Sequence, residues 1–185
     1  MRSVASRSGW RRNVAARASR CRPTIALRCS RANSAFVRYF LDTEYNGWGG
    51  ALLSLALVPD HGEELYLTLD WDGPLEEWVQ RNVVPYLDMV SDQLVSPRLS
   101  RADAARAVAH YLAGDGDPLV VADWPEDIAL FNALLVTGPG VMVEVPEISF
   151  RVVQLPGFST AANSKVPHNA LHDARALRDH ILSME

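Results

Sequence analysis

Three short motifs in this sequence combine side chains that could bind metal ions and activate water. The first is Asp42-Thr43-Glu44, directly after the apolar run 37–41. Alternate residues of a strand project from the same face, so Asp42 and Glu44 would present two carboxylates side by side. Mg²⁺ and Mn²⁺ prefer such oxygen ligands to imidazole or thiolate. Taken alone, this common motif is more typical of a solvated turn after a strand, and a divalent-metal site is the functional alternative.

The second motif is the acidic run from Asp123 to Asp127, which follows the apolar run 119–122. Asp123 and Glu126 have the spacing of a capping box, which predicts that Asp123 starts a helix. Asp127 would share a stripe of that helix with Phe131, and a carboxylate beside an apolar face needs a partner. The partner could be a metal ion, or Asp127 could stabilise the helix N-terminus. We favour Asp127 over Asp123 as the functional residue.

The third motif pairs a histidine with an aspartate. His168 and Asp173 are five residues apart, which on one helix would leave them about 140° out of phase. They converge only if His168 precedes the helix and Asp173 lies in its opening turns. Asn169 is a favoured N-cap residue and permits that arrangement. His172 is the alternative histidine, and as a lone helical histidine it is more typical of a surface position.

In this order the three motifs resemble the DEDDh 3′–5′ exonuclease superfamily, which includes ribonuclease T, oligoribonuclease and the proofreading subunit of DNA polymerase. The run 38–44 and the run 168–174 look closest to a small bacterial, mycobacterial-type 3′–5′ exoribonuclease branch. The resemblance covers about residues 36–184. The family commonly has an asparagine where this chain has Asp123.

The resemblance implies a ribonuclease H-like fold and a two-metal-ion site with Mg²⁺ or Mn²⁺. Asp42, Glu44 and Asp173 would hold one metal, Asp42 would bridge to the second, and Asp127 would contribute through a water. His168 would accept the proton of the attacking water, since histidine is the side chain whose ordinary pKa lies closest to neutral.

The implied activity is hydrolysis of phosphodiester bonds from the 3′ end of a single strand, with release of nucleoside monophosphates. We expect RNA 3′ ends as the substrate and keep a DNA-directed exonuclease open. Two further alternatives are a non-catalytic nucleic-acid-binding module of the same fold and an endonuclease of ribonuclease H type. The second of these does not need the histidine-aspartate helix.

Three residues near the motifs are candidates for substrate binding. Tyr45 and Trp48 follow the first motif and could stack on the terminal base, although one of them could equally be core. Lys165, the single lysine of the chain, lies three residues before His168 and could contact a phosphate. A solvated loop lysine is the alternative.

The elements that position the first motif are strands. Runs rich in branched and aromatic residues predict strands at 37–41, 52–58 and 65–69, and their short connections predict antiparallel pairing. Helical periodicity then takes over. A stretch at 78–87 carries Trp78 on its apolar stripe and is interrupted near Pro85, and a helix at 101–112 has Ser100 as its expected N-cap.

The remaining patterns predict a strand at 119–122, a helix at 126–135, extended segments at 141–145 and 148–153, and a final helix at 169–184. The order of three strands followed by alternating helices and strands indicates an α/β domain with a mixed central sheet flanked by helices. No internal repeat or second folded domain is predicted.

Composition changes sharply near Ala35. Residues 1–35 contain nine arginines and no acid, whereas residues 36–185 carry a net charge of −13. The first segment has no strand or helix period, so we expect it to be disordered by itself, with the exonuclease domain at 36–185. It could be a targeting segment, a basic arm for nucleic acid, or the result of a start placed upstream of Val37.

The composition also bears on the surroundings of the protein. Both cysteines, Cys21 and Cys29, lie in the first segment and match no zinc pattern, so a reducing cytoplasm is compatible and is the expected location. The apolar runs stop short of the roughly 20 residues of a membrane helix, so no membrane association is expected. The acidic body argues against tight binding to long duplexes. The oligomeric state stays open, with a homodimer as one option.

Overall fold

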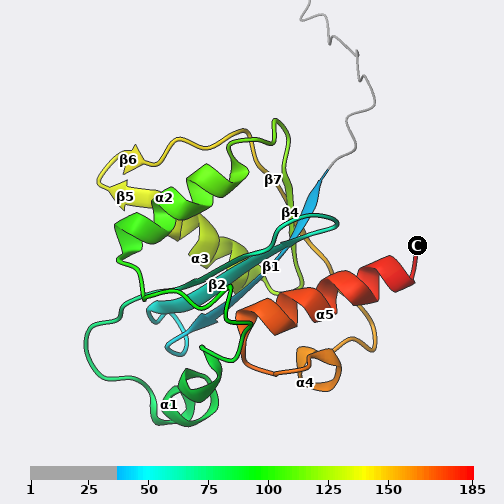
Figure 1. Ribbon diagram of the computed structural model, residues 1–185, viewed down its shortest axis with the longest axis horizontal. Helices are drawn as coiled ribbons and strands as arrows, with labels where there is room; N and C mark the ends of the chain where they lie inside the picture. Colours follow the sequence, from blue (N-terminus) through cyan, green and yellow to red (C-terminus); the bar gives the residue numbers. More distant parts are fainter. Residues whose placement is uncertain (1–36) are drawn as a thin grey trace, which may run out of the picture. The chain divides into compact units, whose positions relative to one another are not determined.

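Five strands form the central sheet of residues 37–185, the part of the chain that the computed structural model describes. The strands are β1 Arg38–Tyr45, β2 Leu52–Pro59, β3 Leu65–Thr68, β4 Leu119–Ala122 and β7 Ser149–Val152. Their order across the sheet is β3-β2-β1-β4-β7 (Figure 1). The first three strands are antiparallel, while β4 and β7 run parallel to β1. The predicted mixed sheet is confirmed, and the predicted segment 1–35, with Cys21 and Cys29, lies outside the described residues.

Helices cover both faces of this sheet. They are α1 Glu77–Asn82, the 3-10 turn η1 Val84–Tyr86, α2 Arg101–Leu112, α3 Pro125–Leu135, α4 Thr160–Asn163 and α5 Ala170–Ser183. In Figure 1, α2 and α3 lie on one side of the sheet and α5 on the other. Among the described helices, none combines the length and the apolar character that crossing a bilayer requires.

The local predictions for the helices are largely confirmed. The amphipathic stretch at 78–87 divides into α1 and η1 around Pro85, as expected from a residue that lacks a backbone donor. The side chain of Ser100 accepts a hydrogen bond from the backbone nitrogen of Asp103 and so caps α2. This cap supplies one of the hydrogen bonds that the start of a helix otherwise lacks.

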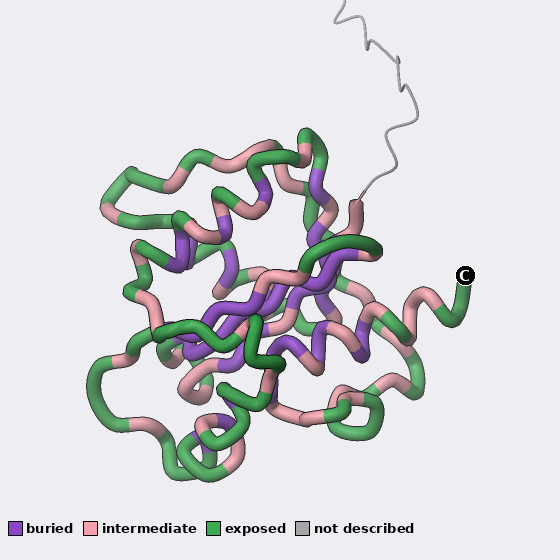
Figure 2. Tube along the Cα trace, in the orientation of Figure 1, coloured by how far each residue is buried: buried purple, intermediate pink, exposed green. Residues whose placement is uncertain are grey.

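Successive side chains of β1 point into two different hydrophobic cores. Tyr39 and Leu41 pack in the core beneath α2 and α3, whereas Phe40 packs in the core beneath α5. Figure 2 shows this burial running along the central strands and the inner side of α5. Because successive residues of a strand face opposite ways, Asp42 and Glu44 continue the α5 side of the sheet, and Thr43 continues the α3 side.

The segment after α3 contains a strand that was not predicted. Strand β6 Val141–Met142 lies within the extended segment expected at 141–145, but it pairs with β5 Val136–Gly138 in a hairpin that the sequence did not predict. The hairpin begins directly at the end of α3, so no turn residue separates the two elements and the sequence carries no boundary signal there. Strand β7 occupies Ser149–Val152 within the predicted segment 148–153.

Candidate metal centre

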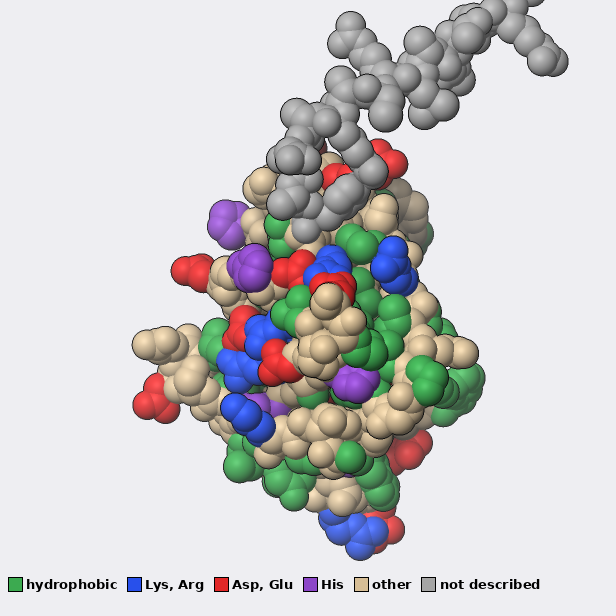
Figure 3. Space-filling model, turned by 90° about the vertical axis from the view of Figure 1, so that its right-hand side faces the viewer, with side chains coloured by type: hydrophobic (Ala, Val, Ile, Leu, Met, Phe, Trp, Pro, Cys, Tyr) green, Lys and Arg blue, Asp and Glu red, His purple; other side chains and the backbone are tan. Residues whose placement is uncertain are grey.

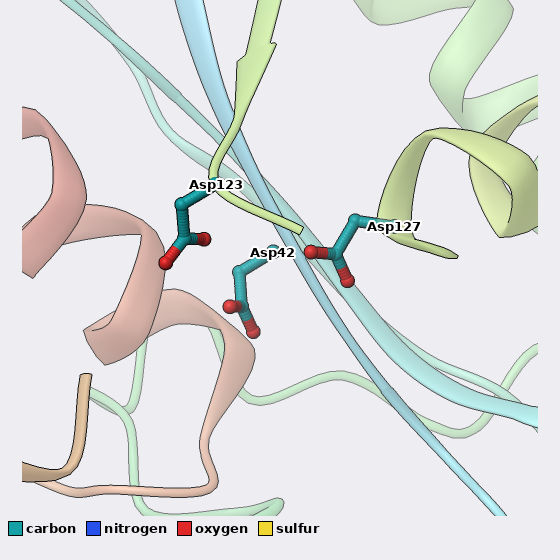
Figure 4. Close-up of side chains that lie close together, drawn as sticks. All are labelled: Asp42, Asp123 and Asp127. Atoms are coloured by element: carbon teal, nitrogen blue, oxygen red, sulfur yellow. The ribbon is translucent and has the colours of Figure 1, made fainter. Parts of the chain in front are cut away.

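Asp42 and Asp123 meet because β4 runs parallel to β1 and ends at Ala122, beside the middle of β1. In the pairing of β1 with β4, Phe40 lies opposite Val121. Continuing that register by two residues brings Asp42 level with Asp123, on strands about 4.8 Å apart. Asp127, in the first turn of α3, completes a group of three carboxylates with oxygen atoms within 4.8 Å of one another (Figure 4).

A second group of carboxylates lies on the α5 side of the same strand. Asp42, Glu44 and Asp173 also present oxygen atoms within 4.8 Å of one another. Asp173 comes from the first turn of α5. Asp42 therefore belongs to both groups, and its carboxylate stands between the three neighbouring elements β4, α3 and α5.

Asp127 is held by a residue from the opposite side of β1. The backbone nitrogen of Thr43 donates to Oδ1 of Asp127 at 3.2 Å, and the Thr43 hydroxyl donates to the same oxygen at 2.6 Å. Asp127 is only 3% exposed and lies on the helix that buries Phe131. The predicted need of this buried carboxylate for a partner is met in part by the two hydrogen bonds from Thr43 to Oδ1.

His168 precedes α5, as the spacing required. Asn169 is the N-cap, and its side chain accepts hydrogen bonds from the backbone nitrogens of Leu171 and His172. The backbone nitrogen of His168 donates to Oδ2 of Asp173 at 3.1 Å. The φ angle of His168 is 65°, which is uncommon for a residue with a side chain. Backbone strain of this kind persists where surrounding contacts enforce it.

The imidazole of His168 packs against an aromatic ring from α1. The rings of Trp78 and His168 lie edge to face, with centroids 5.0 Å apart and an interplanar angle of 85°. Trp78 belongs to the amphipathic stretch predicted at 78–87, yet 52% of it is exposed. Of the residues of α1 only Val79 is buried, because the helix is short and presents a single residue to the core.

The carboxylates of both groups are electrostatically strained. Burial, followed by repulsion from Asp127, Glu44 and Asp173, raises the pKa of Asp42 well above its ordinary value. Burial and repulsion from Asp173 and Asp127 raise the pKa of Glu44 to about 8. Burial likewise raises the pKa of Asp127 to about 7, although the Thr43 hydrogen bonds oppose the rise.

The same cause acts on the remaining two acids, since burial raises the pKa values of Asp123 and Asp173. Within residues 37–185, no ion pair includes any of the five carboxylates, and no lysine or arginine lines the cleft around them. Uncompensated buried charge is costly. A cluster of this kind therefore favours either bound protons or bound cations.

Asp173 has a carboxylate oxygen that could accept a ligand. Its Oδ1 atom is buried without a hydrogen bond of ordinary geometry from the described residues. The nearby Ser164 hydroxyl moderates the rise in the pKa of Asp173, but it forms no such bond. Buried polar atoms in proteins are nearly always satisfied. Oxygen ligands in two overlapping groups, one with an unsatisfied atom, fit Mg²⁺ or Mn²⁺.

The acids and His168 line one cleft of about 430 Å³. All five predicted catalytic residues line it: Asp42, Glu44, Asp127, His168 and Asp173. Tyr45 also lines it. The other aromatic and charged residues that border the cleft are Glu76, Trp78, Asp123 and Trp124.

Two of the residues predicted to bind substrate lie outside this lining. Trp48 is 87% exposed, and Lys165 borders a separate pocket on α5. Trp124, which sequence reasoning passed over, is 55% exposed and does line the cleft. Its position directly after β4 was the available signal, because the carboxyl ends of parallel strands are where α/β sheets place functional groups.

The predicted capping role of Asp123 is wrong. Trp124 is the N-cap residue of α3, and no side chain caps this helix. Asp123 turns instead toward Asp42 (Figure 4). Pro125 at the first helical position has no N–H to satisfy, which reduces the need for a cap.

Comparisons with known proteins add no assignment: no family model matches this sequence, and no curated protein matches it either.

Proposed function

We propose that this protein is a two-metal-ion 3′–5′ exonuclease that removes nucleoside monophosphates from the 3′ end of single-stranded nucleic acid, with RNA as the expected substrate. One observation carries the proposal: Asp42 belongs to two carboxylate groups, and His168 lines the same cleft. Overlapping groups with a common carboxylate are what a pair of metals about 3.5–4 Å apart requires. The mixed five-stranded sheet flanked by helices adds support, because it is compatible with a ribonuclease H-like fold.

Each acid has a distinct place in the proposal. Asp42, Glu44 and Asp173 would hold one divalent ion, and Asp42 would also hold the second, to which Asp127 would contribute through a water, with Asp123 beside them. Mg²⁺ or Mn²⁺ bound there would supply Lewis-acid stabilisation of the charge on the attacking and leaving oxygens. The sequence motif resembling the exonuclease superfamily suggests that Asp127 acts through a water, and the hydrogen bonds from Thr43 hold its carboxylate in place.

His168 would take the proton from the attacking water. Its imidazole borders the cleft, its backbone is tied to Asp173, and its ring rests on Trp78. The hydrogen bond to Asp173 and the contact with Trp78 restrict the orientation of the ring before the substrate enters. A general base must lie within hydrogen-bond reach of the proton that it removes, so a fixed ring favours the reaction.

The cleft suits a strand end better than a long duplex. The lining contains no lysine or arginine and several acids, so affinity for phosphates there depends on bound cations. Half-exposed Trp78 and Trp124 offer aromatic surfaces on which a base could stack. A single-stranded 3′ end can deliver one phosphodiester to the carboxylates and one base to these rings.

The deciding experiment is a time course with 5′-labelled single-stranded RNA and Mn²⁺ or Mg²⁺. We expect a ladder that shortens from the 3′ end and that disappears with EDTA or in Asp42→Ala. The matched control is Asp92→Ala, which removes an exposed aspartate that does not line the cleft. The same assay with DNA of identical sequence tests the preference for RNA.

Other outcomes would replace the proposal. Binding of RNA and DNA without any cleavage would point to a non-catalytic module of the same fold. Internal cuts that do not begin at the 3′ end would indicate an endonuclease. Cleavage that persists both with EDTA and in Asp42→Ala would show that the carboxylate cluster takes no part in the reaction.

A further inference from the structure

A second pocket, of about 210 Å³, lies on the outer side of α5. Its cationic side chains are Lys165, Arg175 and Arg178. Figure 3 faces the end of α5 and shows lysine and arginine side chains gathered there with acids among them. The domain as a whole has a net charge of −13 over residues 36–185, so a pocket with three cations departs from its surroundings.

The arginines of this pocket are fixed in position by Glu64. Arg175 donates to Glu64 through Nε at 2.9 Å and through Nη2, and Arg178 donates to the same carboxylate at 3.4 Å. The hydrogen bonds from Arg175 keep the pKa of Glu64 below its ordinary value, so the carboxylate stays charged. Arg178 also pairs with Asp179. Three cations thus face two carboxylates, which leaves one positive charge in excess.

Lys165 is the cation that supplies this excess. It is exposed, and no ion pair within residues 37–185 includes it. An arginine offers five N–H donors, so Arg175 and Arg178 retain donors beyond those that their carboxylates use. A phosphate group, which carries negative charge and several acceptor oxygens, matches this combination.

The pocket is connected to the cleft through one short segment. Thr160 and His168, at the two ends of that segment, line the cleft, whereas Asn163 and Lys165, between them, line the pocket. Helix α5, which follows this segment, also borders both sites: Asp173 lines the cleft and Arg175 lines the pocket. A strand that leaves the cleft across this segment would bring an upstream phosphodiester beside Lys165.

We infer that the pocket of Lys165, Arg175 and Arg178 binds a backbone phosphate of the nucleic-acid strand whose 3′ end lies in the cleft. This inference rests on the proposed function for the identity of the ligand. It assigns to Lys165 a contact outside the cleft, upstream of the bond that is cleaved. The pocket would therefore contribute to the affinity for longer strands and not to that for the shortest ones.

The test measures binding by fluorescence anisotropy in the full chain carrying Asp42→Asn, so that the strand stays intact. The probes are a labelled RNA dinucleotide and an RNA of about twelve nucleotides, within the range of single-strand site sizes. Lys165→Gln should weaken binding of the longer RNA several-fold and leave the dinucleotide unchanged. The slope of log affinity against log salt should lose about 0.7, the value for one phosphate contact on a single strand.

The controls separate this pocket from general charge effects. Arg106→Gln removes an exposed cation from α2, on the opposite face of the sheet, and should change neither the affinity nor the slope. Lys165→Arg should restore both. All variants carry the same nine arginines in residues 1–35, so differences between variants exclude any contribution from that segment.

The outcomes distinguish this inference from the proposed activity. If Lys165→Gln binds the longer RNA like Arg106→Gln does, the inference is overturned even where the 3′ ladder is seen. Equal losses for the dinucleotide and the longer strand would also overturn it, because they would place Lys165 at the cleft. If the length-dependent loss appears but the enzyme cleaves nothing, the phosphate pocket stands and the exonuclease activity fails.

Discussion

The hydroxyl of Thr43 donates a hydrogen bond of 2.6 Å to Oδ1 of Asp127, and so joins β1 to the first turn of α3. Thr43 faces the opposite side of β1 from Asp42 and Glu44, yet it orients a carboxylate of the same cluster. A single strand thus supplies two acids from one face and the support for a third acid from the other.

Thr43→Val removes this bond while nearly preserving the shape of the side chain. The bond opposes the rise in the pKa of Asp127, so its loss should raise that pKa further and weaken metal binding at neutral pH. Changes to residues that orient metal ligands typically cost about 10–100-fold in metal affinity or activity. Titration of Mn²⁺ by calorimetry and the RNA assay should both report the loss. Thr43→Ser keeps the hydroxyl and should recover most of it.

His168→Ala should lower turnover by about 10²–10⁴, the usual contribution of a general base, while Mn²⁺ binding stays close to that of the parent protein. His61→Ala serves as the control, because His61 is exposed on a turn and does not line the cleft. A loss of Mn²⁺ binding in His168→Ala would contradict the proposed role and make the histidine a ligand. Single-turnover kinetics with labelled RNA separates the chemical step from product release.

The pH dependence of stability should be unusual for an acidic protein. Glu44 has a pKa of about 8 and Asp127 a pKa of about 7 in the folded chain, well above the ordinary values of about 4 in the unfolded chain. Between the pKa values of the unfolded chain and those of the folded chain, the folded state holds more protons than the unfolded state. The free energy of unfolding therefore falls as the pH rises through this range. With EDTA present, the melting temperature should therefore drop from about pH 5.5 to about pH 8.

Two comparisons assign this pH dependence to the cluster. Mn²⁺ should raise the melting temperature most at the higher pH, since ligands that bind only the folded state stabilise it and deprotonated carboxylates bind best. Glu44→Gln should flatten the pH dependence, whereas Glu147→Gln, at an exposed position, should leave it unchanged. A melting temperature that rises with pH in EDTA would mean that these carboxylates are ionised without metal.

Trp124 and Trp48 test which aromatic ring contacts the substrate. Trp124 lines the cleft and Trp48 does not, although 87% of Trp48 is exposed. Base stacking is worth about 1–3 kcal/mol, so Trp124→Ala should raise KM for RNA by about fivefold or more. Trp48→Ala should change KM little. The reverse result would restore the sequence-based expectation that Trp48 stacks on the terminal base.

The sequence by itself determined the features that depend on near neighbours. The Ser100 cap of α2, the break at Pro85 and the Asn169 cap of α5 all follow from backbone hydrogen bonds within a few residues. The position of His168 outside the helix follows in the same way, because two residues five positions apart on one helix would face different directions. The alternation of β1 likewise placed Asp42 and Glu44 on one face before any partner was known.

Only the tertiary structure decided which distant side chains meet. Asp123 reads locally as a helix cap, and it joins the cluster because the register of β1 with β4 brings it level with Asp42. Trp78 and Lys165 lie where the packing of α1 and α5 puts them, one beside His168 and the other in a separate pocket. Contacts between residues some 80 positions apart depend on sheet order and register, and no local pattern of residues encodes these.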